Sequence, residues 1–242
     1  MQRLARAMGA AILMISWSAA VTTQTPPSPD QVVAALKQNL AESKTRLRQY
    51  EWIETTAISL KGEEKSRKQQ RVYYGADGTL VKVPLGPAPA PAPPPQASGR
   101  RGGRVKTRVI ENKKEEMQEY MQQALALIHK YVPPDAALVQ KAKDAGLMKV
   151  GQAQPGIVRA EFSDFVQPAD SMKIDVDAKA LLLSAVTVAT YLEKAEDAVT
   201  LDVRFASLAD GTGYAARTTL NATAKNIQVV VENTGHRPMA AQ

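Results

Sequence analysis

The sequence contains no cysteine and only two histidines, and these absences remove several kinds of site. A chain without cysteine forms no disulfide and carries no lipid-modified N-terminal cysteine. A standard structural zinc site also lacks its ligands, because the two histidines are far apart in the sequence. We expect His129 on a helix at or near the surface, and His236 in a polar C-terminal tail. We therefore predict no metal and no cofactor.

Catalytic motifs are missing as well. The sequence has no His-Glu-x-x-His motif and no Gly-x-Ser-x-Gly elbow. Gly146 and Gly151 have the spacing of a P-loop, but Gln152 and Ala153 stand where lysine and serine or threonine would hold phosphate and magnesium. We find no convergent set of polar residues to replace these motifs. The sequence therefore predicts no catalytic residue and a protein that is not an enzyme.

Aromatic residues make up only 5% of the chain, which argues against a surface that stacks nucleic-acid bases. The formal charge is +7, and removal of Arg3 and Arg6 with an N-terminal leader would leave +5. An excess of this size favours solubility and does not by itself indicate DNA or RNA. We therefore predict no nucleic-acid partner. Beyond this leader the chain also lacks any run of about twenty apolar residues, so we expect no membrane span once the leader is removed.

The first twenty residues have the organisation of a cleaved signal peptide. Arg3 and Arg6 precede a short apolar stretch at 9–17, and Ser18-Ala19-Ala20 offers the small residues that signal peptidase reads. This predicts export to the periplasm of a bacterial envelope. Residues 21–28 are rich in threonine and proline and are expected to form a mobile spacer.

The following segment predicts a helix and a meander of strands. Apolar residues recur at helical spacing over residues 29–48, after Ser28 or Asp30 as a helix cap. β-branched and aromatic residues with intervening polar turns then predict three strands, at 50–60, 67–74 and 80–85.

Residues 86–103 interrupt this meander with alternating proline and alanine followed by a Gly/Arg cluster. Such a segment forms neither ladders nor a core, so it predicts a disordered insertion. Helices are expected next, at about 108–131 and at 136–145, with Gly146 as the cap that ends the second.

The rest of the chain predicts strand after strand. Apolar and polar residues alternate in most of six segments, which gives each strand one buried and one wet face, as in antiparallel sheets. These segments are 157–166, 172–176, 186–192, 199–205, 214–222 and 227–231. We therefore predict an α+β fold in a single domain over residues 29–237, with a tail at 238–242.

One apolar stripe on the expected 108–131 helix has two interpretations. It contains Met117 and Met121, and methionine adapts to variable apolar partners because it is flexible and polarisable. The stripe could equally be ordinary helix-on-sheet core. Both interpretations hold together if this helix packs in the mouth of a curved sheet.

Three segments give the chain a resemblance to the LolA/LolB/RseB-like periplasmic lipoprotein-carrier superfamily. The first helix runs straight into Tyr50-Glu51-Trp52-Ile53-Glu54-Thr55, a hairpin ends in Tyr73-Tyr74-Gly75-Ala76-Asp77-Gly78, and a late strand leads into Asp210-Gly211-Thr212. The resemblance implies a curved antiparallel sheet, an unclosed β-barrel, with helices covering its concave face. It also implies that the helices between 108 and 146 form a lid over an apolar cavity.

The resulting hypothesis is a monomeric periplasmic binding or carrier protein whose ligand is a lipid or the acyl chains of a lipoprotein. The alternative is an envelope interaction or sensor module that binds another protein and no small molecule. The residues expected to line the cavity or the lid are Trp52, Ile58, Met117, Met121, Leu125, Ile128, Val203 and Phe205.

Overall fold

The structure is a computed structural model that describes residues 28–86, 103–132 and 134–239. The predicted signal peptide, nearly all of the predicted spacer and residues 87–102 of the predicted insertion lie outside these ranges. The described elements follow the chain as α1 (Pro29–Leu47), β1 (Tyr50–Leu60), β2 (Glu63–Tyr74), β3 (Leu80–Pro84), α2 (Gly103–Ile128), α3 (Ala136–Asp144), β4 (Met148–Gln154), β5 (Ile157–Ser163), β6 (Ser171–Asp177), β7 (Leu183–Tyr191), β8 (Ala198–Ser207), β9 (Gly213–Ala222), a 3-10 turn (Thr223–Lys225) and β10 (Ile227–Pro238).

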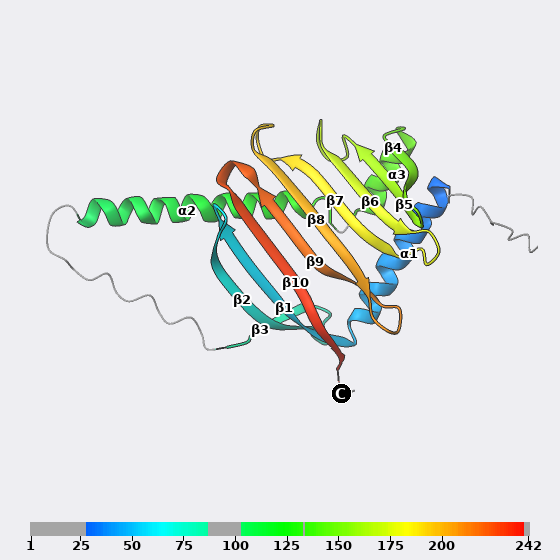
Figure 1. Ribbon diagram of the computed structural model, residues 1–242, viewed down its shortest axis with the longest axis horizontal. Coiled ribbons are helices and arrows are strands. Elements are labelled where there is room, and N and C mark those ends of the chain that lie inside the picture. The colour runs from blue at the N-terminus through cyan, green and yellow to red at the C-terminus, as the bar shows by residue number, and fades with distance from the viewer. Residues whose placement is uncertain (1–27, 87–102, 133, 240–242) are drawn as a thin grey trace, which may run out of the picture.

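The ten strands form one antiparallel sheet in the order β3-β2-β1-β10-β9-β8-β7-β6-β5-β4. The sheet is not closed, because β3 and β4 are its two edges and pair with one neighbour each. Figure 1 shows the sheet twisting and bending towards β3. The predicted α+β fold with a curved, unclosed antiparallel sheet is therefore confirmed.

The last strand lies inside the sheet. β10 pairs with β9, which precedes it, and also with β1, from Tyr50 opposite Pro238 to Leu60 opposite Ile227. The N-terminal meander is therefore attached to the rest of the sheet through the final strand of the chain.

The three helices cover one face of the sheet. Figure 1 shows α2 crossing behind the middle strands, whereas α1 runs diagonally from α3 towards the start of β1. Alternate residues of β5 to β9 point to this helix-covered face and form the core with the C-terminal half of α2. The buried core residues are Val33, Tyr120, Ala124, Leu127, Ile128, Tyr131, Val139, Ala142, Val158, Ala160, Phe162, Phe165, Met172, Ile174, Val176, Val186, Val188, Val199, Leu201, Val203, Leu220, Ala222 and Ile227.

The helix ends follow from local sequence. Ser28 caps α1 in a capping box with Gln31, in which each side chain bonds the other residue's backbone N–H. Asp135 caps α3 by accepting hydrogen bonds from the backbone N–H groups of Ala137 and Leu138. Gly146, with φ of 71°, follows the end of α3 in the left-handed conformation that glycine adopts without strain.

The largest differences from the sequence prediction are found in α2, β4 and β10. α2 begins at Gly103, about five residues earlier than expected. β4 was not predicted, because five of its seven residues are exposed and its apolar alternation stops at Val150. β10 extends to Pro238 through a polar stretch, and the prediction that placed His236 in a tail is therefore wrong.

A buried polar network joins the end of α2 to the loop between β5 and β6. The carboxylate of Asp170, 3% exposed, accepts hydrogen bonds from the backbone N–H groups of Phe165, Val166 and Gln167 at 2.6–2.9 Å. It also accepts one from the hydroxyl of Tyr131 at 2.5 Å. Burial, together with this bond, raises the pKa of Tyr131, so its hydroxyl stays protonated and donates at neutral pH.

Candidate functional site

A groove lies between α1 and the helix-covered face of the sheet. Its volume of about 590 Å³ falls within the range of small-molecule sites. Most of its lining is apolar or aromatic, and we refer to it as the α1 groove. The lining residues are Val33, Lys37, Leu40, Ala41, Ser43, Lys44, Leu47, Tyr74, Pro134, Val139, Phe205, Gly213, Tyr214 and Ala215.

One wall of the groove is the apolar stripe of α1. Val33, Leu40 and Leu47 are spaced seven residues apart, which places them on one side of the helix. Val33 is buried against the core, but Leu40 and Leu47 are only partly buried. The stripe is thus anchored at its N-terminal end and stands over a hollow along the rest of its length.

Polar contacts hold α1 at both ends. Near its start, Asp30 forms an ion pair with Lys143 of α3. Near its end, Arg46 donates to the backbone carbonyl of Asp210 at 3.3 Å. Just beyond α1, Tyr50 donates to the Asp210 carboxylate at 2.8 Å. Between these ends, the side-chain amide of Asn39 donates to the backbone carbonyl of Leu181, in the polar groove on the other side of α1.

The floor of the groove comes from β8 and β9 at an irregularity in their pairing. The register shifts between Arg204 and Phe205, and Phe205 then lies opposite Ala215. Gly213 allows α1 to approach here, because a Cβ at this position would lie 3.1 Å from the Ser43 hydroxyl oxygen. Small residues on the floor and aromatic residues beside them give the groove its depth.

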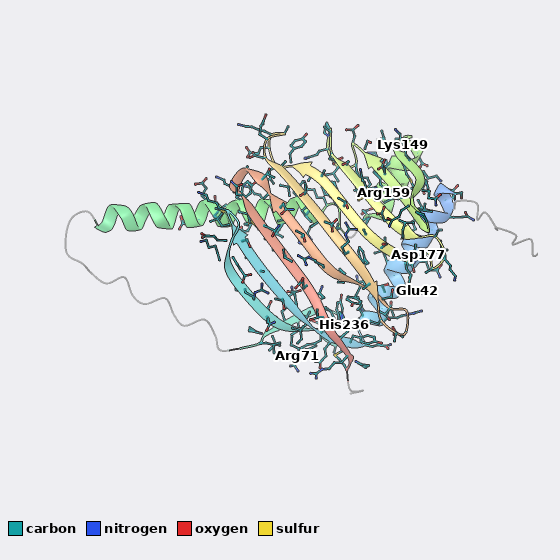
Figure 2. All side chains as sticks on the ribbon, viewed as in Figure 1. Glu42, Arg71, Lys149, Arg159, Asp177 and His236 are labelled. Carbon is teal, nitrogen blue, oxygen red and sulfur yellow. The ribbon has the colours of Figure 1, made fainter. Side chains whose placement is uncertain are left out.

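An aromatic cluster closes the end of the groove near β1. The ring of His236 lies 5.6 Å from Trp52, nearly parallel to it, and 4.0 Å from Tyr214. Trp52 also contacts Tyr74, with ring centroids 6.0 Å apart. A bulge in β10 at Gly235, with φ of 63°, lies next to His236 in this cluster. Figure 2 shows His236 near the end of β10, where α1 runs into β1.

The environment of His236 predicts a pH dependence of stability. Burial lowers the pKa of His236 below its usual 6.5, so between the folded and unfolded pKa values the unfolded chain binds more protons. This contribution to stability is complete above pH 6.5 and is lost as the pH falls towards the folded pKa. Chemical unfolding measured from pH 7.5 to 5 should show a fall in the free energy of unfolding. A His236→Phe variant should lack this fall. Because His129 is exposed, the matched His129→Gln variant should show the same fall as the natural chain. An equal fall in the free energy of unfolding in all three proteins would contradict the prediction.

A second groove, of about 850 Å³, runs along the other side of α1. Gln38, Asn39, Glu42 and Arg46 give it a polar lining on the helix. This groove is larger, but its polar groups do not suit a hydrocarbon. Ser43 lines both grooves, so α1 is flanked by open space on two sides.

The predicted ligand-contacting residues separate into three groups in the structure. Phe205 lines the α1 groove and Trp52 supports its aromatic end through Tyr74. The core or its margin holds Met117, Met121, Ile128 and Val203. Ile58 and Leu125 belong to neither the groove nor the core, and Ile58 is half-buried on β1. Leu125 is 45% exposed. Ligand contact by these residues stays a prediction.

The sequence reasoning missed most of the groove. It assigned the lid to the helices between 108 and 146, whereas the groove described above has α1 as its wall. Helical spacing joins Leu40 to Leu47, but no spacing rule in the sequence joins these leucines to Tyr74 and Tyr214. Within the described parts of the chain, no three acidic or histidine side chains are placed to hold a metal ion together.

No protein-family model and no curated protein sequence matches this chain. In the described ranges, no helix is long and apolar enough to cross a membrane.

Several solved structures are similar to the chain at low sequence identity. One is a DUF1329 family protein from Desulfovibrio piger, 13% identical, with 89% of this chain and 95% of that chain covered and a TM-score of 0.43. Another is a LolA superfamily protein from Nitrosomonas europaea, 9% identical, with coverages of 85% and 94% and a TM-score of 0.36. A third is MucB in complex with MucA(peri), 11% identical, with coverages of 86% and 100% and a TM-score of 0.20. One of these similar structures is therefore that of a protein from the LolA superfamily, which the sequence resembles.

Proposed function

We propose that this protein binds and carries an apolar ligand, a lipid or the acyl chains of a lipoprotein, in the α1 groove. The observation that carries the proposal is the lining, in which hydrocarbon and aromatic side chains enclose about 590 Å³ without a carboxylate. Export by a signal peptide at residues 1–20 would place this activity in the periplasm. The proposal is a binding function and includes no chemical step.

The aromatic residues support this proposal because the chain has so few. The whole sequence contains seven tyrosines and three phenylalanines, and Tyr74, Phe205 and Tyr214 all line the α1 groove. Burial of apolar surface is favourable by about 0.8 kcal/mol for each CH₂ removed from water. An acyl chain in the groove would gain this burial and would also cover the partly exposed side chains of Leu40 and Leu47.

In this proposal the lid is α1, and not the helices between 108 and 146, which are α2 and α3. The C-terminal half of α2 is embedded, since Ala124 and Leu127 are 0% and 7% exposed. Moving α2 would expose the central core. α1 has open grooves on both sides and is held by the buried side chain of Val33 and a few polar contacts along its length, so it can move at lower cost than α2.

Native mass spectrometry of protein purified from the periplasm tests the function directly. A carrier should purify together with a bound lipid, which is released when the complex is activated in the mass spectrometer. A clean mass for the apo chain, together with no binding of an apolar fluorescent probe, would exclude the carrier function.

Replacing Ala41 with tryptophan should fill the groove and weaken binding of a neutral apolar fluorescent probe at least tenfold. Ala41 lines the groove on an exposed position of α1, so the indole can enter the hollow without displacing core residues. Ala126→Trp is the matched control, because Ala126 is an exposed alanine of α2 outside the groove. Fluorescence titration gives both affinities. Equal affinities in the two variants would place the ligand elsewhere.

The open edges of the sheet favour the alternative function, an interaction module. Among the residues that the structure describes, β3 and β4 each pair with one strand and leave their other side unpaired, and such edges accept a strand from another protein. In this case the chain would purify without lipid and Ala41→Trp would leave partner binding unchanged. The same two experiments therefore separate the alternatives.

A further inference from the structure

Charged residues on α1 are distributed unevenly between its two sides. Lys37 and Lys44 line the α1 groove, where they are the charged members among the fourteen lining residues that the structure describes. Glu42 lies on the other side of the helix, in the polar groove, and pairs with Arg46 at 3.4 Å. The lining of the α1 groove therefore contains two cationic side chains and no acidic one.

Neither lysine has a charged partner in the described part of the chain. Four other lysines, Lys65, Lys82, Lys173 and Lys225, form ion pairs with glutamates. The two carboxylates of α1, Asp30 and Glu42, are paired with Lys143 and Arg46. Lys37 and Lys44 are both exposed, and their ammonium groups remain available to a bound anion.

The geometry suits a ligand with an anionic head and a hydrocarbon tail. Lys37 and Lys44 are seven residues apart, which places them on one face of the helix about 10 Å from each other along its axis. Leu40 and Ala41 lie between them and also line the groove. Lysine covers apolar surface with its methylene stem and keeps its ammonium group at the boundary with water. An anionic head group at the opening of the α1 groove can therefore contact the ammonium groups while the hydrocarbon tail lies deeper in the groove.

We infer that the ligand of the α1 groove is an anionic amphiphile, in which a carboxylate or phosphate head contacts Lys37 and Lys44 and the alkyl chain occupies the groove. This inference rests on the proposed function and narrows it from apolar ligands in general to negatively charged ones. It excludes neutral lipids as the preferred ligand.

Three ligands with the same twelve-carbon tail test the head group. Dodecanoate, dodecyl phosphate and dodecanol are titrated against the lipid-stripped mature chain in displacement of a neutral fluorescent probe. We expect at least one of the two anions to bind about tenfold more tightly than the alcohol at low salt, with a smaller ratio at high salt. The carboxylate and phosphate arms distinguish a fatty acid from a phosphate-bearing lipid.

The variant Lys37→Gln/Lys44→Gln should remove this preference, so that the two anions bind no more tightly than dodecanol. Lys141→Gln/Lys149→Gln is the matched control, because both lysines are exposed, lie outside the groove and give the same change in net charge. The control should retain the preference for anions.

Each outcome has a defined meaning. The inference would be overturned if the natural chain bound anions and alcohol equally, or if Lys37→Gln/Lys44→Gln kept the preference for anions. Either result would leave the proposed binding of an apolar ligand in the groove unaffected. Failure of all three ligands to displace the probe would overturn both the inference and the proposed function.

Discussion

Replacement of Asp170 with alanine is expected to lower the free energy of unfolding by about 4 kcal/mol. The carboxylate is buried and accepts four hydrogen bonds, three from the backbone between Phe165 and Gln167 and one from Tyr131. Alanine would leave these donors without an acceptor, and those of Phe165 and Tyr131 are buried while those of Val166 and Gln167 are part-buried. Each unsatisfied buried donor costs about 1–3 kcal/mol, and relaxation of the loop recovers part of the sum.

Urea unfolding followed by circular dichroism measures this loss. Asp202→Ala serves as the matched control, because Asp202 pairs with Arg204 on the solvent side at 2.8 Å and exposed pairs of this kind contribute less than about 1 kcal/mol. If the two variants unfold at the same urea concentration, Asp170 does not hold the β5–β6 loop to α2.

Replacement of Trp52 with alanine should lower stability by about 3 kcal/mol and also weaken ligand binding. The indole is 8% exposed, contacts the rings of Tyr74 and His236, and donates to the side chain of Asn233 at 3.0 Å. Its removal leaves a cavity at the end of the α1 groove, and Tyr74 loses the ring against which it packs.

A Trp52→Phe variant separates the two contributions of the indole. Phenylalanine keeps the aromatic contact and loses the hydrogen bond to Asn233, which should cost about 1 kcal/mol. Probe affinity should remain near that of the natural chain in Trp52→Phe and fall in Trp52→Ala. A Trp52→Ala protein with unchanged melting temperature and probe affinity would show that the aromatic cluster supports neither the fold nor the groove.

Local sequence patterns predicted most of the fold. Strict alternation identified β8, where Val199, Leu201 and Val203 are buried and Arg204 is exposed. The patterns failed where strands carry polar residues. β4 lies at an edge with little to bury, and the end of β10 owes its strand structure to pairing with β1, a contact with residues about 180 positions away in the chain.

The candidate site was harder to predict because a groove is an unfilled space between elements. The apolar stripe of α2 was found in the sequence, but a small rotation of the helix decides which residues face inwards. Tyr120 and Leu127 are buried, whereas Leu125 is exposed. Likewise, α1 has an apolar stripe like that of any packed helix. Only the tertiary arrangement shows that part of its stripe stands over a hollow.

The position of β10 has a consequence for how the chain acquires its structure. Until residues 227–238 arrive, β1 and β9 have no common neighbour, and the polypeptide consists of two unfinished halves. Assembly that depends on such distant partners is slow. Because β10 is also the strand that joins β1 to β9, deletion of residues 227–238 would separate the sheet into one part with three strands and another with six.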